Sequence, residues 1–289
     1  MSQKHPVVAI TGSSGAGTTT VKLAFEHIFR RESINPAIIE GDSYHRYARA
    51  EMKTKMAENN LSHFGPEANE FGVLADTFKA YGDNGQCQRR YYLHSDEEAV
   101  HHNGRLGTDK GPGEFTPWED IEQGTDLLFY EGLHGLAKSD EHDVSEHVDL
   151  GIGVVPIVNL EWIQKIHRDN AERGYSAEAI VDSILRRMPD YINYITPQFS
   201  RTDINFQRVP TVDTSDPFIA RDIPTPDESF VVIRFRDPKK FGTDFPYLLS
   251  MVDGSFMSRR NSIVVPGGKM GMAMEIVLAP IIHDLMANR

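Results

Sequence analysis

Glycines and threonines near the start of the chain have the spacing of a loop that wraps phosphate groups. The segment reads Gly12-x-x-x-x-Gly17-Thr18-Thr19. In such loops the backbone N–H groups cradle the phosphates, a Lys reaches the β- and γ-phosphates, and the following Ser or Thr hydroxyl holds Mg²⁺. Thr18 occupies the position of that Lys. The spacing predicts a nucleoside triphosphate site whose missing cation is supplied from elsewhere in the chain.

The residues on either side of this loop fit a strand that leads into a helix. A short apolar run covers residues 7–10, and apolar residues recur at helical spacing from Val21 to Phe29. The first turn of such a helix directs its unpaired N–H groups and the positive end of its dipole at the phosphates. We therefore assign the loop to nucleotide phosphates rather than to a glycine-rich turn without a ligand. Its residues are Gly12, Ser13, Ser14, Gly15, Ala16, Gly17, Thr18, Thr19 and Thr20.

Two carboxylates follow predicted strands. Asp42 comes after the run 36–40, and Glu131 ends the run 126–130. Ligands of open α/β sheets bind at the carboxyl ends of the strands, so both carboxylates are expected on the same rim as the phosphate loop. An acidic residue at the end of a neighbouring strand holds Mg²⁺ in such sites, directly or through water. Glu131 is therefore the candidate metal ligand together with Thr19, and a surface Glu is the alternative.

A predicted helix that begins near residue 160 carries the positive charge that the loop lacks. Lys165 and Arg168 are three residues apart and share a helix face, and Asp169 lies one turn beyond Lys165. Gly174 directly follows Arg173 and is expected to end the helix. A charged helix end next to a glycine suits a lid that brings cations over a phosphoryl group and excludes water. An exposed helix with ion pairs four residues apart is the alternative.

Apolar runs typical of strands alternate with helical patterns along the chain, which is the order of a mostly parallel sheet. Strands after the first are expected at 36–40, 126–130, 150–155, 204–209, 229–235 and 262–265. A helix rich in Met and Ile follows Gly267-Gly268 and runs to about residue 286. We predict a single α/β domain over residues 1–289, in which helices flank a mixed, mostly parallel sheet that the C-terminal strands extend.

Residues 80–115 differ from the rest because polar residues dominate and periodicity is weak. We interpret this segment as a long excursion over the rim of the active site. The sequence Thr116-Pro117-Trp118-Glu119 then combines an N-cap hydroxyl, a Pro in the first helical position and a carboxylate three residues after the cap. This pattern predicts that a helix begins there.

Composition narrows the class of protein. The formal net charge of −12 argues against a nucleic-acid partner, which a basic surface would favour. No apolar run approaches the length of about 18 residues that a membrane span needs, and we expect no membrane partner. The single cysteine, Cys87, excludes an internal disulfide and a cysteine-based zinc site. We expect a soluble cytoplasmic protein.

Four motifs, in this order, resemble the phosphoribulokinase family in its bacterial form. They are the glycine loop at 12–20, Gly-Asp-Ser-Tyr-His-Arg at 41–46, Tyr-Glu-Gly-Leu-His at 130–134 and Arg-Asp-x-x-x-Arg-Gly at 168–174. Uridine kinase and bacterial pantothenate kinase share the layout, but their loops carry the Lys that Thr18 replaces. The resemblance implies a P-loop kinase-like fold, with ATP and Mg²⁺ as cofactors. It also implies phosphorylation of ribulose 5-phosphate at its 1-hydroxyl, giving the 1,5-bisphosphate used in Calvin cycle carbon fixation.

Phosphoryl transfer requires positioning, charge neutralisation and a base for the hydroxyl proton. Asp42 is the expected base, in agreement with the family pattern. Lys165 and Arg168 are left to neutralise the γ-phosphate as a lid at about 160–190 closes. Asp169 either orients those cations or assists magnesium, and the sequence leaves both roles open.

A phosphorylated acceptor also needs an anion site at its far end. We assign His45, Arg49 and Arg173 to this site. Arg presents a planar fork of donors to phosphate, and His45 lies only three residues from Asp42. Arg46 points in a different direction from its neighbour His45, and the family pattern favours His45 and Arg49.

The resemblance further implies a homo-oligomer, with an octamer as one form, that NADH activates and AMP inhibits. The cations from which an effector site would be assembled are Arg31, Arg234, Arg236, Arg259 and Arg260. Two other functions stay open. One is a kinase for a different hydroxylated acceptor, such as a nucleoside or pantothenate, and the other is a nucleotide-binding regulator without transferase activity.

Overall fold

The computed structural model describes residues 4–12, 18–59, 61–155, 157–219 and 222–289, with the side chains at 18, 19, 172 and 173 left out. The predicted loop residues Ser13, Ser14, Gly15, Ala16 and Gly17 therefore lie outside the described part of the chain. The side chains of Thr18, Thr19 and Arg173 lie outside it as well.

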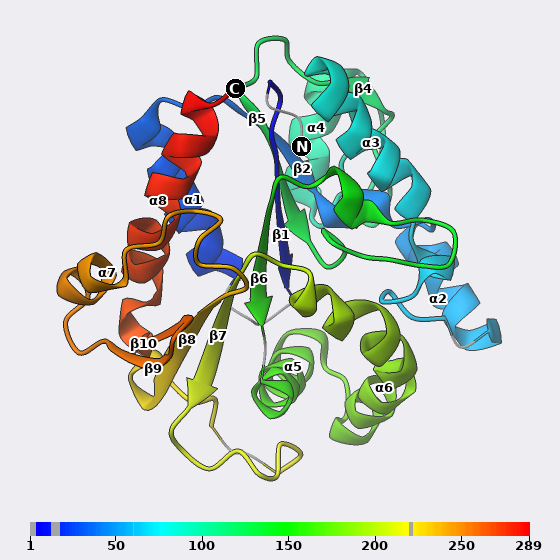
Figure 1. Cartoon of the computed structure of the whole chain (residues 1–289). Coiled ribbons are helices and arrows are strands. Elements are labelled where there is room, and N and C mark those ends of the chain that lie inside the picture. The colour runs from blue at the N-terminus through cyan, green and yellow to red at the C-terminus, as the bar shows by residue number, and fades with distance from the viewer. Residues whose placement is uncertain (1–3, 13–17, 60, 156, 220–221) are drawn as a thin grey trace.

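The centre of the molecule is an eight-stranded sheet in the order β2-β5-β1-β6-β7-β8-β10-β9, which Figure 1 shows from one side. Its first four pairings are parallel and its last three are antiparallel. The strands are β1 (Val7–Gly12), β2 (Pro36–Glu40), β5 (Leu127–Gly132), β6 (Leu150–Val155), β7 (Ile204–Pro210), β8 (Ser229–Phe235), β9 (Phe256–Arg259) and β10 (Ser262–Pro266). The predicted mixed, mostly parallel sheet with C-terminal strands extending it is confirmed.

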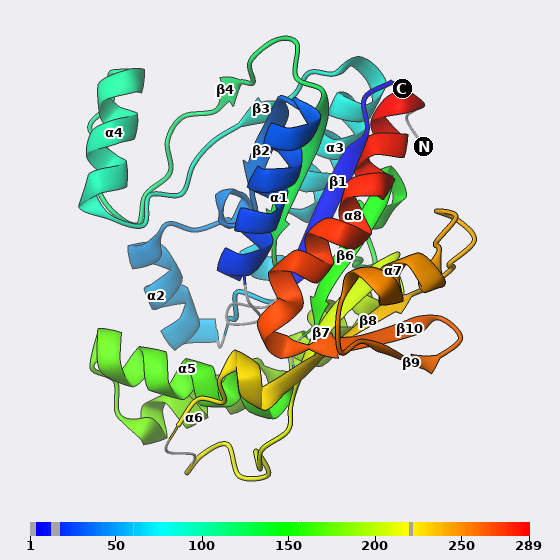
Figure 2. The same cartoon turned by 90° about the vertical axis from the view of Figure 1, so that its left-hand side faces the viewer.

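Helices cover both faces of this sheet, and a small separate pair is formed by β3 (Gln88–Arg89) and β4 (Glu119–Asp120). The helices are α1 (Thr18–Glu32), α2 (Arg49–Asn59), α3 (Phe71–Asn84), α4 (Asp96–Leu106), α5 (Val158–Arg173), α6 (Ala177–Asp190), α7 (Phe245–Met251) and α8 (Met270–Ala287). In both views α5 and α6 lie together beyond the carboxyl ends of the parallel strands (Figures 1 and 2).

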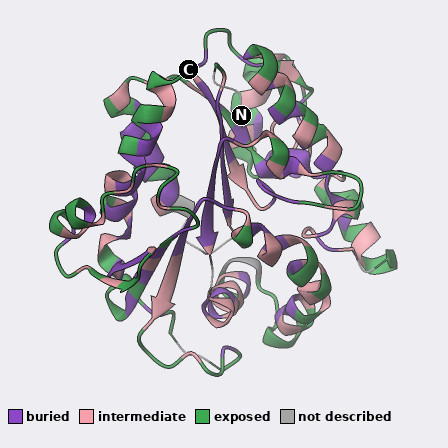
Figure 3. Cartoon of the chain, viewed as in Figure 1, coloured by how far each residue is buried: buried purple, intermediate pink, exposed green. Residues whose placement is uncertain are grey.

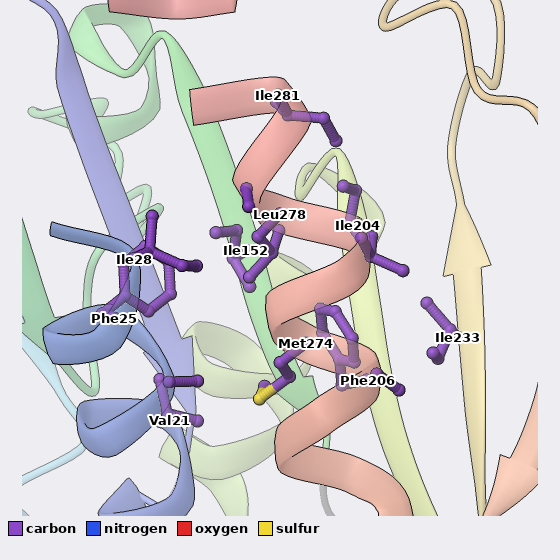
Figure 4. Packing of buried hydrophobic residues seen from close by; sticks show 14 of the residues in the cluster. Val21, Phe25, Ile28, Ile152, Ile204, Phe206, Ile233, Met274, Leu278 and Ile281 are labelled. Carbon is purple, nitrogen blue, oxygen red and sulfur yellow. The ribbon is translucent and has the colours of Figure 1, made fainter. Parts of the chain in front are cut away.

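Alternation along β1 divides the core between the two faces, because successive strand residues point to opposite sides. Val8 and Ile10 belong to the cluster formed with α1 and α8, whereas Val7 and Ala9 belong to the cluster formed with α3. Figure 4 shows the first cluster, with side chains of α1 and α8 meeting those of β6 and β7. The buried residues concentrate in the sheet and on the inner helix faces (Figure 3).

Helix α8 is unusually apolar for its length. The segment Gly267–Ala287 is long and apolar enough to cross a membrane by length and hydropathy alone, so the expectation that no apolar run approaches that length is wrong. In this fold Met274, Leu278 and Ile282 are buried in the core cluster against α1 and the sheet. Packing inside the protein accounts for its apolar character.

The prediction that a helix begins at Thr116 is wrong. Thr116 Oγ1 accepts a hydrogen bond from the backbone N–H of Tyr91, 2.9 Å away, instead of capping a helix. The backbone N–H of Thr116 in turn donates to Tyr91 O at 2.9 Å, and residues 119–120 form β4. The segment is held by pairing with a distant part of the chain, and this pairing overrides the local capping pattern.

The interpretation of 80–115 as an irregular excursion holds only in part. Helix α3 continues to Asn84, and α4 lies within the segment. The Ser95 side chain caps α4 by accepting from the backbone N–H of Glu98, and Gly107 ends the helix in the left-handed conformation at φ 66°. These are ordinary cap signals, and α4 was predictable from them.

Candidate active site

The ends of four parallel strands form the rim that holds the predicted site. In the sheet register Glu40 of β2 is opposite Glu131 of β5, and Gly12 of β1 is opposite Val154 of β6. A Cβ atom at position 12 would lie 2.9 Å from the carbonyl oxygen of Val154, so the start of the phosphate loop requires glycine. The chain leaves β1 at Gly12 and enters α1 at Thr18, as the loop spacing predicts.

Asp42 lies on a 3₁₀ turn, Gly41–Tyr44, that directly follows β2. This turn packs closely on the end of β5, since a Cβ atom at Gly41 would lie 2.7 Å from Gly132 Cα. Asp42 therefore occupies the same rim as Glu131. The position agrees with the sequence prediction, and packing of glycine on glycine brings it about.

Two histidines flank the Asp42 carboxylate. His45 Nε2 lies 3.3 Å from Asp42 Oδ1, and His94 Nε2 lies 3.5 Å from Asp42 Oδ2. Burial opposes ionisation of Asp42, but the hydrogen bond with His45 and the charges of His45, His94 and His63 outweigh it and lower the pKa of Asp42 to about 2. The carboxylate is thus ionised at neutral pH and able to accept a proton.

The ring of His45 is oriented by Asn69. His45 Nδ1 lies 2.8 Å from Asn69 Oδ1. The Asn69 amide nitrogen donates to the carbonyls of His63 and Gly65 at 2.9 and 2.7 Å, which fixes its oxygen toward His45. His45 therefore carries a proton on Nδ1 and turns Nε2 toward Asp42.

A third histidine, His63, packs against His45. The ring of His63 lies 4.7 Å from that of His45. Burial, together with the charges of His45 and Arg187, lowers the pKa of His63 to about 3. His63 is therefore uncharged near neutral pH, and its charge acts on Asp42 only in acid, where both groups titrate.

Glu131 lies in an environment that suits a divalent cation. Burial raises its pKa, the nearby carboxylates of Glu40 and Asp42 raise it further, and Lys22 only partly opposes this. With Gly12 of the phosphate loop it lines a small hollow at the rim. A bound cation would relieve both the burial and the repulsion between carboxylates.

No group of three or more metal-binding side chains converges among the residues that the structure describes. This does not conflict with Mg²⁺, which is usually held by one or two carboxylates, waters and substrate phosphates. Glu131 fits such a site as a single protein carboxylate, with the Thr19 hydroxyl as the further candidate.

The cations predicted for the lid lie on α5 as expected. Lys165 Nζ forms an ion pair with Asp169 Oδ2. Arg168 Nη2 lies 3.0 Å from Asp169 Oδ1. Burial opposes ionisation of Asp169, yet the hydrogen bond and charge of Lys165 and the charge of Arg168 lower its pKa. Asp169 is 3% exposed and forms ion pairs with both cations.

The lid helix ends where the sequence predicts. Gly174 caps α5 in the left-handed conformation at φ 67°, a backbone conformation that favours glycine. Helix α6 then returns, and Arg187 on it lies close enough to both Lys165 and His63 to lower their pKa values, in each case after burial as the larger cause. Helices α5 and α6 therefore lie beside the Asp42 cluster.

Arg49 and Arg46 have different partners. Arg49 Nη2 donates to the carbonyl of His94 at 3.3 Å. Arg46 instead pairs with Glu70, with 3.3 Å between Arg46 Nη2 and Glu70 Oε2. His94 thus contacts Asp42 through its ring and Arg49 through its backbone carbonyl, whereas Arg46 pairs with Glu70.

Sequence reasoning missed His94, which comes from the excursion. It lies just before α4 and reaches Asp42 through the folding of a long connection. A histidine at the end of Tyr91-Tyr92-Leu93-His94 carries no spacing signal that would link it to residue 42.

A strand and a helix joined by a glycine-rich segment, a carboxylate at the end of the neighbouring strand and a nearby helix with cations are the features of a P-loop kinase site. Comparison with known proteins agrees. Residues 7–215 match the model of the phosphoribulokinase / uridine kinase family. The chain therefore belongs to this family and is a kinase.

Relatives match over the whole length. The phosphoribulokinase of Xanthobacter flavus is 60% identical over 295 residues, which cover 100% of this chain and 99% of the relative. That of Nitrobacter vulgaris is 57% identical with the same coverage. The solved structure of phosphoribulokinase from Rhodobacter spheroides is 52% identical, covers 99% of each chain and superposes with a TM-score of 0.89.

Proposed function

We propose that this kinase transfers the γ-phosphoryl group of ATP to the 1-hydroxyl of ribulose 5-phosphate, giving ADP and ribulose 1,5-bisphosphate for the Calvin cycle. The observation that carries the proposal is the ionised Asp42 carboxylate between His45 and His94, 3.3 and 3.5 Å away. This arrangement combines a base with positive or hydrogen-bonding groups for a phosphorylated acceptor. The full-length likeness to proteins named phosphoribulokinase supports it.

Asp42 accepts the proton of the 1-hydroxyl as that oxygen bonds to the γ-phosphorus and the bond to the β,γ-bridging oxygen breaks. General-base assistance of this kind contributes about 10²- to 10⁴-fold in rate. The depressed pKa means that Asp42 is already in its basic form at neutral pH. The proton thus passes to Asp42, the phosphoryl group to the 1-oxygen, and ADP departs as the leaving group.

His45, Arg49 and Arg173 bind the 5-phosphate at the far end of the acceptor. Arg49 supports this role through its contact with the carbonyl of His94, which places it beside the base. A guanidinium offers two parallel donors to a phosphate, and this fixes the orientation of the sugar. An uncharged acceptor such as uridine would leave these groups unpaired, which disfavours it.

The glycine loop 12–20 binds the ATP phosphates, and Lys165 and Arg168 bring charge to the γ-phosphate as α5 and α6 close. Thr19 and Glu131 hold Mg²⁺, which neutralises the triphosphate. Asp169 keeps the two lid cations in place through its ion pairs with them. Lys165 and Arg168 thus supply the positive charge of the loop Lys, whose position Thr18 occupies.

Four further features belong to the same proposal. The chain is a single domain with its lid at about 160–190, it assembles into a homo-oligomer, it works in the cytoplasm, and NADH activates it. Among the arginines considered for the effector, Arg236 is paired with Asp203 at 2.7 Å and Arg31 with Glu32 at 3.3 Å. An effector at either residue would have to compete with these pairs.

ADP release should be measured with ribulose 5-phosphate, uridine and pantothenate as acceptors, at equal ATP and Mg²⁺. We expect turnover with ribulose 5-phosphate and only background with the other two. Turnover with uridine or pantothenate alone would establish a kinase of another acceptor. ATP binding without turnover on any acceptor would establish a nucleotide-binding regulator.

A further inference from the structure

Arg90, just after β3, reaches across to the turn that carries the base. Its Nε donates to the carbonyl of Ser43 at 2.7 Å, and its Nη2 donates to the carbonyl of His45 at 2.8 Å. The two carbonyls lie on either side of Tyr44, at the end of the turn on which Asp42 sits. One guanidinium from a distant part of the chain thus donates two hydrogen bonds to this turn.

Aromatic rings hold the guanidinium in place. Its central carbon lies 3.9 Å from the centroid of Phe115 and 4.8 Å from that of Trp118. Trp118 also packs edge-on against Tyr44, with 5.8 Å between ring centroids. The side chain is therefore fixed by stacking as well as by hydrogen bonds, as suits a planar cation.

Arg90 forms no ion pair with any carboxylate among the described residues. Burial lowers its pKa, although Glu70 and Tyr44 act in the opposite direction. The guanidinium still stays charged at neutral pH, because arginine keeps its proton throughout the physiological range. A half-buried cation whose contacts are two carbonyls and two aromatic rings is not explained by surface ion pairing.

The other carbonyls of the turn have backbone partners. The carbonyl of Asp42 accepts from the N–H of His45 at 3.2 Å, and that of Tyr44 accepts from the N–H of Glu70 at 2.8 Å. Arg90 supplies the donors for Ser43 and His45. Helix ends leave such carbonyls without partners unless a side chain or water satisfies them.

We propose that Arg90 is a positioning residue, which holds Asp42 and His45 in register with the acceptor by fixing the carbonyls of Ser43 and His45. The proposal rests on the proposed role of Asp42 as the base. Arg90 acts through the backbone, because the charges that lower the pKa of Asp42 come from His45, His94 and His63. Its loss should displace the base without changing the base's protonation.

The neighbouring arginine provides a matched control. Arg89 is also half-buried, but its Nη2 pairs with Glu122 at 2.8 Å and its Nε with Glu119 at 3.3 Å, away from the turn. Arg90→Met and Arg89→Met should be compared for kcat, KM for ATP, thermal midpoint and the pH dependence of kcat. Arg90→Lys and Arg90→Ala with added guanidinium chloride at low concentration complete the set.

We expect Arg90→Met to lower kcat by about 10- to 100-fold, because small displacements of a reacting group have effects of this size. KM for ATP and the acid limb of the kcat profile should stay as in the wild type. Arg90→Lys should recover little, since an ammonium does not reproduce the fork, whereas guanidinium should restore part of the activity of Arg90→Ala. Arg89→Met should keep kcat within about threefold of the wild type, because the ion pairs of Arg89 with Glu119 and Glu122 lie away from the turn.

Equal kcat values for Arg90→Met and Arg89→Met would overturn the proposal. So would a shifted acid limb in Arg90→Met, because Arg90 would then act through charge. If Arg90→Met does not fold, guanidinium rescue of Arg90→Ala decides, and an absence of rescue in a folded Arg90→Ala counts against positioning. Wild-type turnover of ribulose 5-phosphate tests the proposed function separately from all these results.

Discussion

His45 and Asp42 are joined on one turn, with 3.3 Å between His45 Nε2 and Asp42 Oδ1. Asn69 fixes the ring from its other nitrogen at 2.8 Å. The consequence is a carboxylate whose pKa is lowered to about 2 although burial acts to raise it. The proposed base is thus paired with a residue that we also propose as a contact of the acceptor.

Replacing His45 should make the activity more sensitive to acid. In His45→Asn the hydrogen bond and charge that lower the pKa of Asp42 are lost, while the burial that raises it remains. The pKa of Asp42 should therefore rise, and the acid limb of the kcat profile should move to higher pH. The measurement is kcat against pH at saturating substrates, with His101→Asn on the exposed face of α4 as the control. An acid limb that stays in place in His45→Asn would show that His45 does not set the ionisation of Asp42.

Arg49 and Arg46 allow a matched test of the acceptor's phosphate site. Arg49 lies beside His94, whereas Arg46 pairs with Glu70 at 3.3 Å. Arg49→Ala should raise KM for ribulose 5-phosphate by about tenfold or more, because a charge-assisted contact with phosphate is lost. Arg46→Ala should change it by less than about threefold, the effect of a partly exposed ion pair. KM for ATP should stay constant in both variants. A larger rise of this KM in Arg46→Ala than in Arg49→Ala would show that Arg49 is the wrong choice for the phosphate site.

Lys165 should carry much of the charge that the loop lacks at Thr18. Lys165→Met should lower kcat by about 10²-fold or more, the effect of removing a cation aimed at developing charge. Lys79→Met, at an exposed position on α3, is the control for loss of a lysine. Circular dichroism and the thermal midpoint will show whether the Asp169 partner left behind by the change disturbs the fold. An unchanged rate would remove Lys165 from the mechanism.

Glu131 should make magnesium binding depend on pH. Burial and nearby carboxylates raise its pKa, so protons compete with Mg²⁺ for the group, and the affinity for Mg²⁺ should weaken as pH falls. The measurement is the free Mg²⁺ concentration that gives half-maximal rate, at several pH values and saturating MgATP. Glu131→Gln should raise that concentration by about tenfold or more and lose most of the pH dependence. The exposed Glu146→Gln should behave as the wild type, and a Glu131→Gln variant that does so as well would exclude Glu131 as the ligand.

The core of the fold was predictable because it depends on local patterns. The apolar runs of β1, β2, β5 and β6 and the helical spacing after Thr20 follow directly from which faces must be buried. Helix α4 could also have been predicted, since Ser95 and Gly107 are clear caps. Strand β4 could not, because it forms through pairing with β3 about 30 residues away along the chain.

Some residues of the candidate site were also predictable from local patterns, and others were not. Asp42 follows β2 and Glu131 lies near the end of β5, and the rule that ligands bind at the carboxyl ends of strands places them together. His94 and Arg90 lie in the excursion, and only the folded chain brings them to Asp42 and to the turn around it. No periodicity encodes such contacts, because they depend on where a long connection packs.

The most direct test of the account is the steady-state kcat of Asp42→Asn with ATP and ribulose 5-phosphate, measured beside the wild type. The amide keeps the shape of the side chain but cannot accept the hydroxyl proton as a carboxylate does. We predict robust turnover by the wild type, a kcat about 10²- to 10⁴-fold lower in Asp42→Asn, and unchanged binding of ATP. A folded Asp42→Asn variant that keeps more than about a tenth of wild-type kcat would contradict the assignment of Asp42 as the base. A wild type with no turnover of ribulose 5-phosphate above background would contradict the proposed function itself.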